Sequence, residues 1–161
     1  MALSESTLAT ALENMTPTLT AGEGEQALAE AYGDYMANRA QASLVLITQA
    51  SVESFAVPAM AGAMAFTPGA SSSEGAAAVV AGLVAFWGAL VAAPALYFSG
   101  ATLITPPTFA GLQAALAAAF DANTSGEATL EEAAEALGAV IHPATDNQGT
   151  ATIASVSYPI T

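Results

Sequence analysis

The sequence predicts a mainly α-helical small domain, and three observations carry that prediction. The chain has 161 residues, of which 54% are hydrophobic, so it suits one domain with a buried core. Apolar residues recur at helical spacing along most of it, whereas the segment from Gly149 alternates β-branched and small residues. The longest apolar run, from Glu74 to Phe98, has the length of a long central helix that is buried on every side.

The N-terminal part of the chain predicts two helices joined by a linker. Ser4 to Met15 should form a short helix, because the serine can cap it and its leucines fall on one face. Residues 16–24 contain a proline and two glycines and predict a linker. Helical spacing returns from Glu25 to about Ala42, where Tyr32 and Tyr35 are expected to pack in the core.

Weaker signals separate this second helix from the central run. Leu44 to Thr48 is short and partly β-branched, so we expect an irregular segment or the end of the second helix. Pro58 suits the start of a small helix, which Pro68 and Gly69 would close.

The central run should form a helix with at least two apolar faces. Residues 71–73 are serines that can cap it, and Glu74 lies in the first turn, where its charge favours the helix dipole. Pro94 lacks an amide proton, so a kink or break is expected near Ala92 or Ala93. The two faces are formed by Val80, Val84, Trp87 and Val91 and by Leu83, Phe86 and Leu90.

Residues 75–98 are also long enough to cross a bilayer, which makes a membrane span the alternative to a buried helix. The chain contains a single basic residue, Arg39, so neither flank supplies the positive charge that normally orients a span. The run is rich in alanine and glycine, which favours close contact between helices. We therefore predict a core helix covered by protein, either within the chain or from other subunits.

The C-terminal part predicts a helical hairpin followed by an extended arm. Thr108 to Phe120 and Thr129 to Ile141 each carry one apolar face, so the two helices should pack together. The tail lacks helical spacing and is expected to pair with a strand of a neighbouring subunit. We divide the chain into a helical domain, residues 1–148, and an extended C-terminal arm, residues 149–161.

Composition and charge exclude several classes of function. Fourteen acidic residues against one basic residue give a formal net charge of −13, which disfavours nucleic acid and anionic lipid as direct partners. The chain has no cysteine, so disulfides, thiol catalysis and cysteine-bound zinc are excluded. His142 is the only histidine, and we expect it to contact the helix dipole or a carbonyl group. We find no nucleophile elbow or phosphate loop and predict a protein that is not an enzyme.

The stretch from Asp121 to Glu132 fits the spacing of a calcium-binding EF-hand loop. Its oxygen ligands would come from positions one, three, five and twelve, with a glycine at the sixth. The eighth and eleventh positions lack the usual apolar residues, and no second loop exists to pair with it. The alternative is a turn followed by a Thr129–Glu132 capping box. The predicted ligands are Asp121, Asn123, Ser125 and Glu132.

Three stretches of the chain resemble small alanine-rich proteins that tailed bacteriophages encode. They are the opening MALSESTLATALENMTPT, the central GLVAFWGALVAAPALYFSGATLITPP and FAGLQAALAAAFDANTSGEATLEEAAEALGAVIHP, which a GTAT tail follows. The resemblance covers most of the chain but lies in layout and short phrases. It implies a structural part of a phage virion, in the neck or tail, and no catalytic residues.

These observations lead to three hypotheses of function. The first is a structural virion protein of the head–tail neck or tail that acts as a homo-oligomer and contacts other virion proteins. The second is a small membrane protein of holin type that spans the bilayer with residues 75–98. The third is a helical module that binds calcium, and no other cofactor is expected.

Overall fold

The computed structural model describes residues 3–13, 20–37, 40–123 and 129–161, and most of these are helical, which confirms the predicted class. The helices are α1 (Glu5–Glu13), α2 (Ala21–Ala37), α3 (Gln49–Ser51), the π-helical segment η1 (Val52–Ala56), α4 (Val57–Ala63), α5 (Ser72–Ala92), α6 (Pro94–Tyr97), α7 (Leu112–Asn123) and α8 (Leu130–Thr145). The strands are β1 (Gln41–Ala42), β2 (Val45–Leu46), β3 (Ala101–Thr105), β4 (Thr150–Ile153) and β5 (Val156–Pro159).

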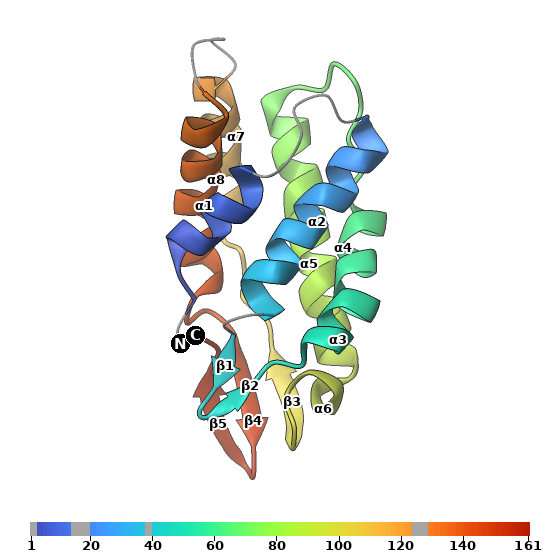
Figure 1. Cartoon of the computed structure of the whole chain (residues 1–161), viewed down its shortest axis with the longest axis vertical. Coiled ribbons are helices and arrows are strands. Elements are labelled where there is room, and N and C mark those ends of the chain that lie inside the picture. Colours follow the sequence, from blue (N-terminus) through green and yellow to red (C-terminus); the bar gives the residue numbers. More distant parts are fainter. Residues whose placement is uncertain (1–2, 14–19, 38–39, 124–128) are drawn as a thin grey trace.

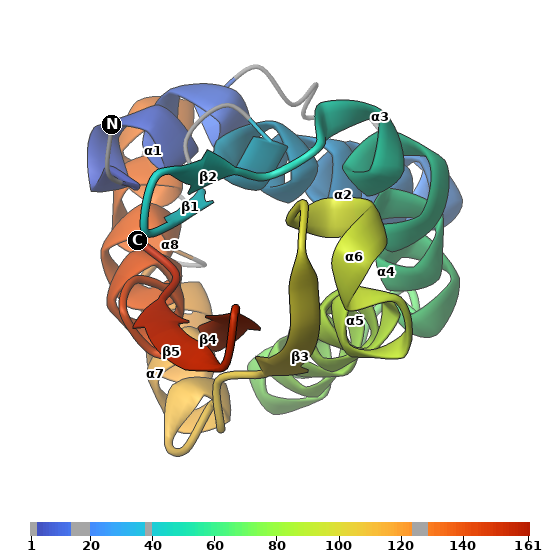
Figure 2. The same ribbon diagram turned by 90° about the horizontal axis from the view of Figure 1, so that it is seen from below.

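Six of the helices form a closed ring around one hydrophobic core. Each packs against the next in the order α1, α2, α4, α5, α7, α8, and α8 packs back against α1 (Figure 2). The strands gather at one end of the long axis (Figure 1). In the centre lie the largest fully buried side chains, which include Tyr32, Tyr35, Phe86, Trp87 and Tyr97. Each helix therefore buries its inner side and leaves an outer side for solvent or for a partner.

Helix α5 begins and ends where the sequence predicts. Ser71 and Glu74 form a capping box in which the Glu74 Oε2 accepts from the Ser71 backbone N–H at 2.8 Å. These bonds lower the pKa of the Glu74 carboxyl. The helix ends at Ala93, and Pro94 opens the short α6, which confirms the predicted break.

Burial of α5 is one-sided within the chain. Leu83, Phe86 and Trp87 are fully buried, whereas Val84 is 55% and Val91 is 38% exposed. Within a single chain the predicted cover is therefore present on the inner side alone, and cover of the outer side by other subunits stays a prediction. Its ring neighbours α4 and α7 flank α5, and the ring places no element across its outer side (Figure 2).

The chain between α2 and α5 differs from the prediction. The second helix ends at Ala37, and residues 41–46 form a hairpin, so the expectation of irregular structure or helix there is wrong. Pro58 stands in the first turn of α4, as predicted, but α3 and η1 precede α4 without a break, so helical structure begins earlier, at Gln49. A π-helical turn precedes this proline, whose missing N–H cannot continue the normal ladder.

The C-terminal hairpin of helices forms as predicted, and α8 is longer than expected. Helices α7 and α8 pack against each other. Helix α8 continues through Pro143 to Thr145, whose hydroxyl donates to the Ile141 carbonyl at 3.0 Å. Tyr32 of α2 also bonds that hydroxyl at 3.1 Å, so the core holds the last turn in place.

The C-terminal arm is extended but does not project from the molecule. Strands β4 and β5 form an antiparallel hairpin, and β4 pairs with β3 of the same chain. The expected pairing with another subunit is therefore wrong for β4. The chain end is also fixed, because Gln41 and Thr161 exchange two backbone hydrogen bonds and Ile160 is fully buried.

Gly149 tests how tightly this arm packs against the core. A Cβ atom there would lie 2.7 Å from Cζ3 of Trp87 and 3.2 Å from the Thr105 carbonyl oxygen. We expect Gly149→Ala to lower the free energy of unfolding by about 1–3 kcal/mol through overpacking. Urea denaturation measures this. The control is Gly24→Ala in α2, where a Cβ meets nothing within 4 Å and stability should rise or stay equal.

Candidate functional site

Charge divides the helical ring into two halves. Residues 54–73 and 75–120 contain no charged side chain, and they supply α4, α6, β3, nearly all of α5 and most of α7. The other half, α2, α1 and α8, is acidic and carries Glu5, Glu13, Glu23, Glu25, Glu30, Asp34, Glu131, Glu132 and Glu135. We call the first half, made of α4, α5 and α7, the uncharged face.

The middle of the uncharged face is the outer side of α5. Four exposed residues lie there at spacings of three, four and three, which places them in one row along the helix. After Glu74, α5 consists of alanine, glycine, valine, leucine, phenylalanine and tryptophan. We call the row the α5 stripe, and it consists of Ala81, Val84, Gly88 and Val91.

Gly88 has no packing reason within the chain to be a glycine. A Cβ atom at this position would meet nothing within 4 Å. At Gly82, earlier in the helix and on the inner side, it would lie 2.6 Å from Cγ of Met64 and 3.2 Å from Cγ of Met60, so that glycine allows α4 and the residue after it to approach. Glycine inside a helix costs about 1 kcal/mol relative to alanine. Gly88 therefore marks a place where the outer surface of α5 is hollowed without any gain to the single chain.

The uncharged surface continues onto the end of the molecule that carries the strands. Residues 40–52 and 147–161 hold no charged side chain. Large apolar side chains are exposed on elements at this end, and such a patch commonly marks an interface. They are Leu44, Leu46, Leu96, Leu103 and Val156.

By length and composition α5 could also cross a membrane. Its inner side, however, is held by polar as well as apolar contacts. The Trp87 indole Nε1 donates to the Tyr32 hydroxyl at 3.0 Å, and the Tyr32 ring meets Phe86 edge-on at 4.8 Å between centroids. Helix α2, which supplies this tyrosine, also carries Glu30 and Asp34.

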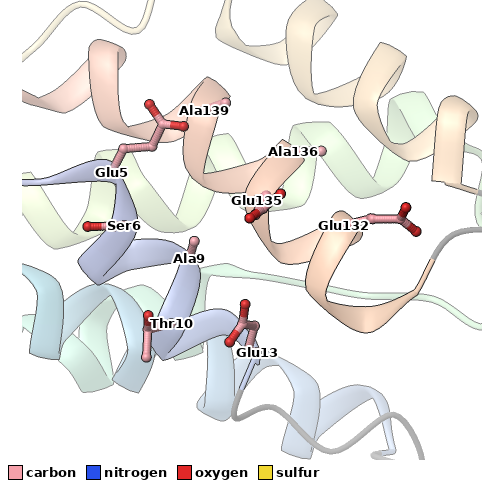
Figure 3. Close-up of a pocket in the computed structure, with 9 residues that line it drawn as sticks. All are labelled: Glu5, Ser6, Ala9, Thr10, Glu13, Glu132, Glu135, Ala136 and Ala139. Carbon is pink, nitrogen blue, oxygen red and sulfur yellow. The ribbon is translucent and has the colours of Figure 1, made fainter.

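The acidic half contains an open groove of about 810 Å³ between α1 and α8 (Figure 3). Alanines of both helices line it, and the carboxylates of Glu5, Glu13 and Glu135 stand around it. Glu132, at the edge of the groove, forms a capping box with Thr129 at the start of α8. So much negative charge in one groove excludes anionic ligands.

The predicted calcium ligands are only partly described. Asp121 lies exposed in the last turn of α7, Asn123 is the last residue of that helix, and Ser125 lies outside the described residues. Glu132 forms the capping box with Thr129, whose N–H and hydroxyl donate to its Oε2 at 2.7 and 3.0 Å. These bonds lower the pKa of the Glu132 carboxyl. The calcium loop stays a prediction.

A chain of buried hydrogen bonds joins three helices of the ring. The Tyr32 hydroxyl accepts from Trp87 and bonds the Thr145 hydroxyl. Burial raises the pKa of Tyr32 to about 12, and these two hydrogen bonds offset part of the rise. Because the hydroxyl stays neutral near pH 7, its role is to satisfy the indole and to hold α8.

His142 lies in the last turn of α8, where the sequence suggested a dipole contact, and its side chain bonds a tyrosine hydroxyl and not a carbonyl group. Its Nδ1 lies 2.8 Å from the Tyr35 hydroxyl, and the two rings meet edge-on. Burial, followed by the nearby Tyr32 and Asp146, raises the pKa of Tyr35. A tyrosine held neutral in this way is a poor acid or base near neutral pH. The prediction that both tyrosines pack in the core is confirmed.

No metal-binding site is assembled among the residues that the structure describes. Within those ranges, no group of three or more histidine, cysteine, aspartate or glutamate side chains could hold an ion. Asp146 Oδ1 is buried without a hydrogen-bond partner there, but Oδ2 of the same carboxylate accepts from Asn147 at 2.9 Å.

Alkaline pH should destabilise the fold through Tyr32. Its pKa is about 12 in the folded chain against an ordinary value of 10, so the unfolded chain loses the proton first as pH rises. The difference in the pKa of Tyr32 therefore contributes to the free energy of unfolding in full below pH 10. This contribution, on the order of 3 kcal/mol, is lost as the pH rises through 12. Urea denaturation across that interval measures it. The dependence should flatten in Tyr32→Phe, and an equal slope in that variant would contradict the assignment.

Titration calorimetry tests the calcium loop. Binding predicts heat in the wild-type chain that is much reduced in Glu132→Gln, which removes the carboxylate but keeps a side chain able to complete the capping box. Absence of heat in the wild type would exclude the site.

Comparison with protein-family models, with curated proteins and with solved structures finds no match to this chain.

Proposed function

We propose that the protein is a non-enzymatic structural component that acts as a homo-oligomer, with the uncharged face as its contact surface. The observation that carries the proposal is the division of the ring, because an exposed apolar stripe lies in the middle of a helical layer that carries no charge over residues 57–63, 75–92 and 112–120. Apolar surface left exposed on a folded chain gains free energy when a partner covers it.

The charge of the chain favours this surface over the acidic half. Two copies that each carry a net charge of −13 repel one another, and a single arginine cannot offset fourteen carboxylates. Contact through the uncharged face keeps the acidic helices α1, α2 and α8 of both copies on the outside. Self-association through the acidic half would instead bring carboxylates together.

The resemblance to alanine-rich phage proteins supports the location and the partners. In this proposal the oligomer is part of a tailed-phage virion, at the head–tail neck or in the tail, and binds other virion proteins. It does not bind nucleic acid directly, since the net charge repels phosphate.

A membrane protein is the second candidate, favoured by the length and composition of α5. Insertion would require α5 either to leave the Tyr32 hydroxyl and the ring or to carry α2, with Glu30 and Asp34, into the bilayer. Both routes are costly, because charged and unpaired polar groups are disfavoured in hydrocarbon. The self-associating protein is therefore the preferred function.

Light scattering coupled to size-exclusion chromatography tests the proposal. In buffer without detergent, we expect the wild-type protein to have the mass of an oligomer, in which each chain contributes 15.9 kDa. Ala81→Asp on the uncharged face should shift it to the monomer, because the new carboxylate would be buried in the contact. Ala139→Asp adds the same charge to an exposed position of α8 and should leave the mass unchanged.

Mass spectrometry of purified particles tests the location. The chain should be present at a constant copy number in virions of a phage that encodes it. A wild-type chain that is monomeric at every concentration and absent from particles would contradict the proposed function. A need for detergent to stay dissolved would support the membrane protein instead.

A further inference from the structure

We infer that two copies of the chain pack α5 against α5 in antiparallel orientation, with Val84 of each copy seated over Gly88 of the other. This inference rests on the proposed function and names the contact that would carry it. The occupant of the α5 stripe is a second copy of the same chain, related by a two-fold axis.

The α5 stripe is complementary to itself when it is reversed. Val84 and Gly88 lie two residues to either side of position 86, and Ala81 and Val91 lie five residues to either side. In an antiparallel pair centred there, Val84 faces Gly88 and Ala81 faces Val91, each twice. Every valine thus meets a glycine or an alanine, as a knob meets a hole. A two-fold contact requires a surface that matches itself in this way.

Gly88 is the member of the α5 stripe that most directly indicates a partner at this place. The single chain would accept a side chain there, since nothing lies within 4 Å of an added Cβ. An added side chain would also improve the helix, so the glycine lowers the stability of the folded monomer. Small residues on a helix surface allow a second helix to approach closely. Val84, 55% exposed, is the side chain that the hollow at Gly88 would receive.

Charge and composition favour a second copy over other occupants. A basic partner would bind the acidic half, because the uncharged face offers it no carboxylate between Glu74 and Asp121. A lipid surface is bound by large apolar side chains with basic residues beside them. The α5 stripe has alanine, glycine and valine, and the one tryptophan of the chain is buried on the inner side.

The flanking helices supply the rest of the contact. A stable protein–protein interface buries about 800 Å² on each partner, more than one row of small residues provides. Helices α4 and α7 lie on either side of α5 and are uncharged over residues 57–63 and 112–120. They bring uncharged surface to both edges of the α5 pair without opposing carboxylates.

Exchanging Val84 and Gly88 tests the register. Gly88→Val should weaken the dimer roughly tenfold or more, because valine would oppose valine, and Val84→Gly should weaken it by leaving the hollow empty. The double variant Val84→Gly/Gly88→Val restores a large residue opposite a small one, and its dissociation constant should return to within about threefold of wild type. Gly22→Val, at an open position of α2, is the matched control and should not change association. Sedimentation velocity measures association, and circular dichroism confirms that each variant folds.

Cysteine crosslinking tests the orientation, since the natural chain has no cysteine. Ala81→Cys/Val91→Cys should form covalent dimers on mild oxidation, because these positions face each other in the antiparallel pair. Ala81→Cys alone should stay uncrosslinked, because position 81 of one copy lies beside position 81 of the other only in a parallel pair. Crosslinking of the single variant would overturn the proposed orientation.

The outcomes separate this inference from the proposed function. A wild-type oligomer that none of the position 84 and 88 variants weakens would overturn the α5 contact and leave self-association standing. A wild-type chain that is monomeric throughout would overturn both. If the wild-type chain sediments together with phosphatidylcholine vesicles, the uncharged face binds lipid, and the α5 pair is overturned.

Discussion

The Trp87 indole is the constraint on which the arrangement of the ring depends. It is fully buried on the inner side of α5, and its N–H must find an acceptor away from water. Tyr32 of α2 supplies that acceptor and then engages Thr145 at the end of α8. Gly149 allows the chain that enters β4 to pass against the ring of the indole. One side chain therefore sets the positions of two other helices and of the C-terminal strands.

Because the Trp87 N–H of the inner side is satisfied within the chain, α5 is a core helix on that side and a surface helix on the other. Hydropathy along the sequence averages both sides and cannot separate them. The same run of alanine, valine and glycine would suit a membrane span, a fully enclosed helix or a helix–helix contact between subunits. The ring order, with α4 and α7 at its flanks, and the exposure of each side chain show which residues remain uncovered.

Local signals in the sequence predict the starts of α5 and α8 better than the bounds of α2 and α7 or the strands. The serine cap of α5, the Thr129 capping box and the break at Pro94 are confirmed, because each depends on residues within one turn. Helix α2 instead begins at Ala21, inside the predicted linker, and ends at Ala37. The β1–β2 hairpin and the β3–β4 pairing join residues distant in sequence or lie in strands too short for a period to appear. His142 was singled out, but its Tyr35 partner could not be identified, because the two lie on different helices. The predicted calcium ligands stay untested, since Ser125 lies outside the described residues.

The two sides of α5 carry residues of different size, the larger ones in the core of the chain and the smaller ones on the side of the proposed contact. Its leucine, phenylalanine and tryptophan side chains are all buried in the ring, where overpacking or truncation would cost stability. Its outer side carries small residues that make little contact within the chain, so a change there leaves the core intact. A glycine on that side lowers monomer stability, and the proposed α5 contact would offset that cost. The acidic half would then face away from such a contact. Its negative charge would keep assembled copies in solution and would oppose further association through α1, α2 and α8.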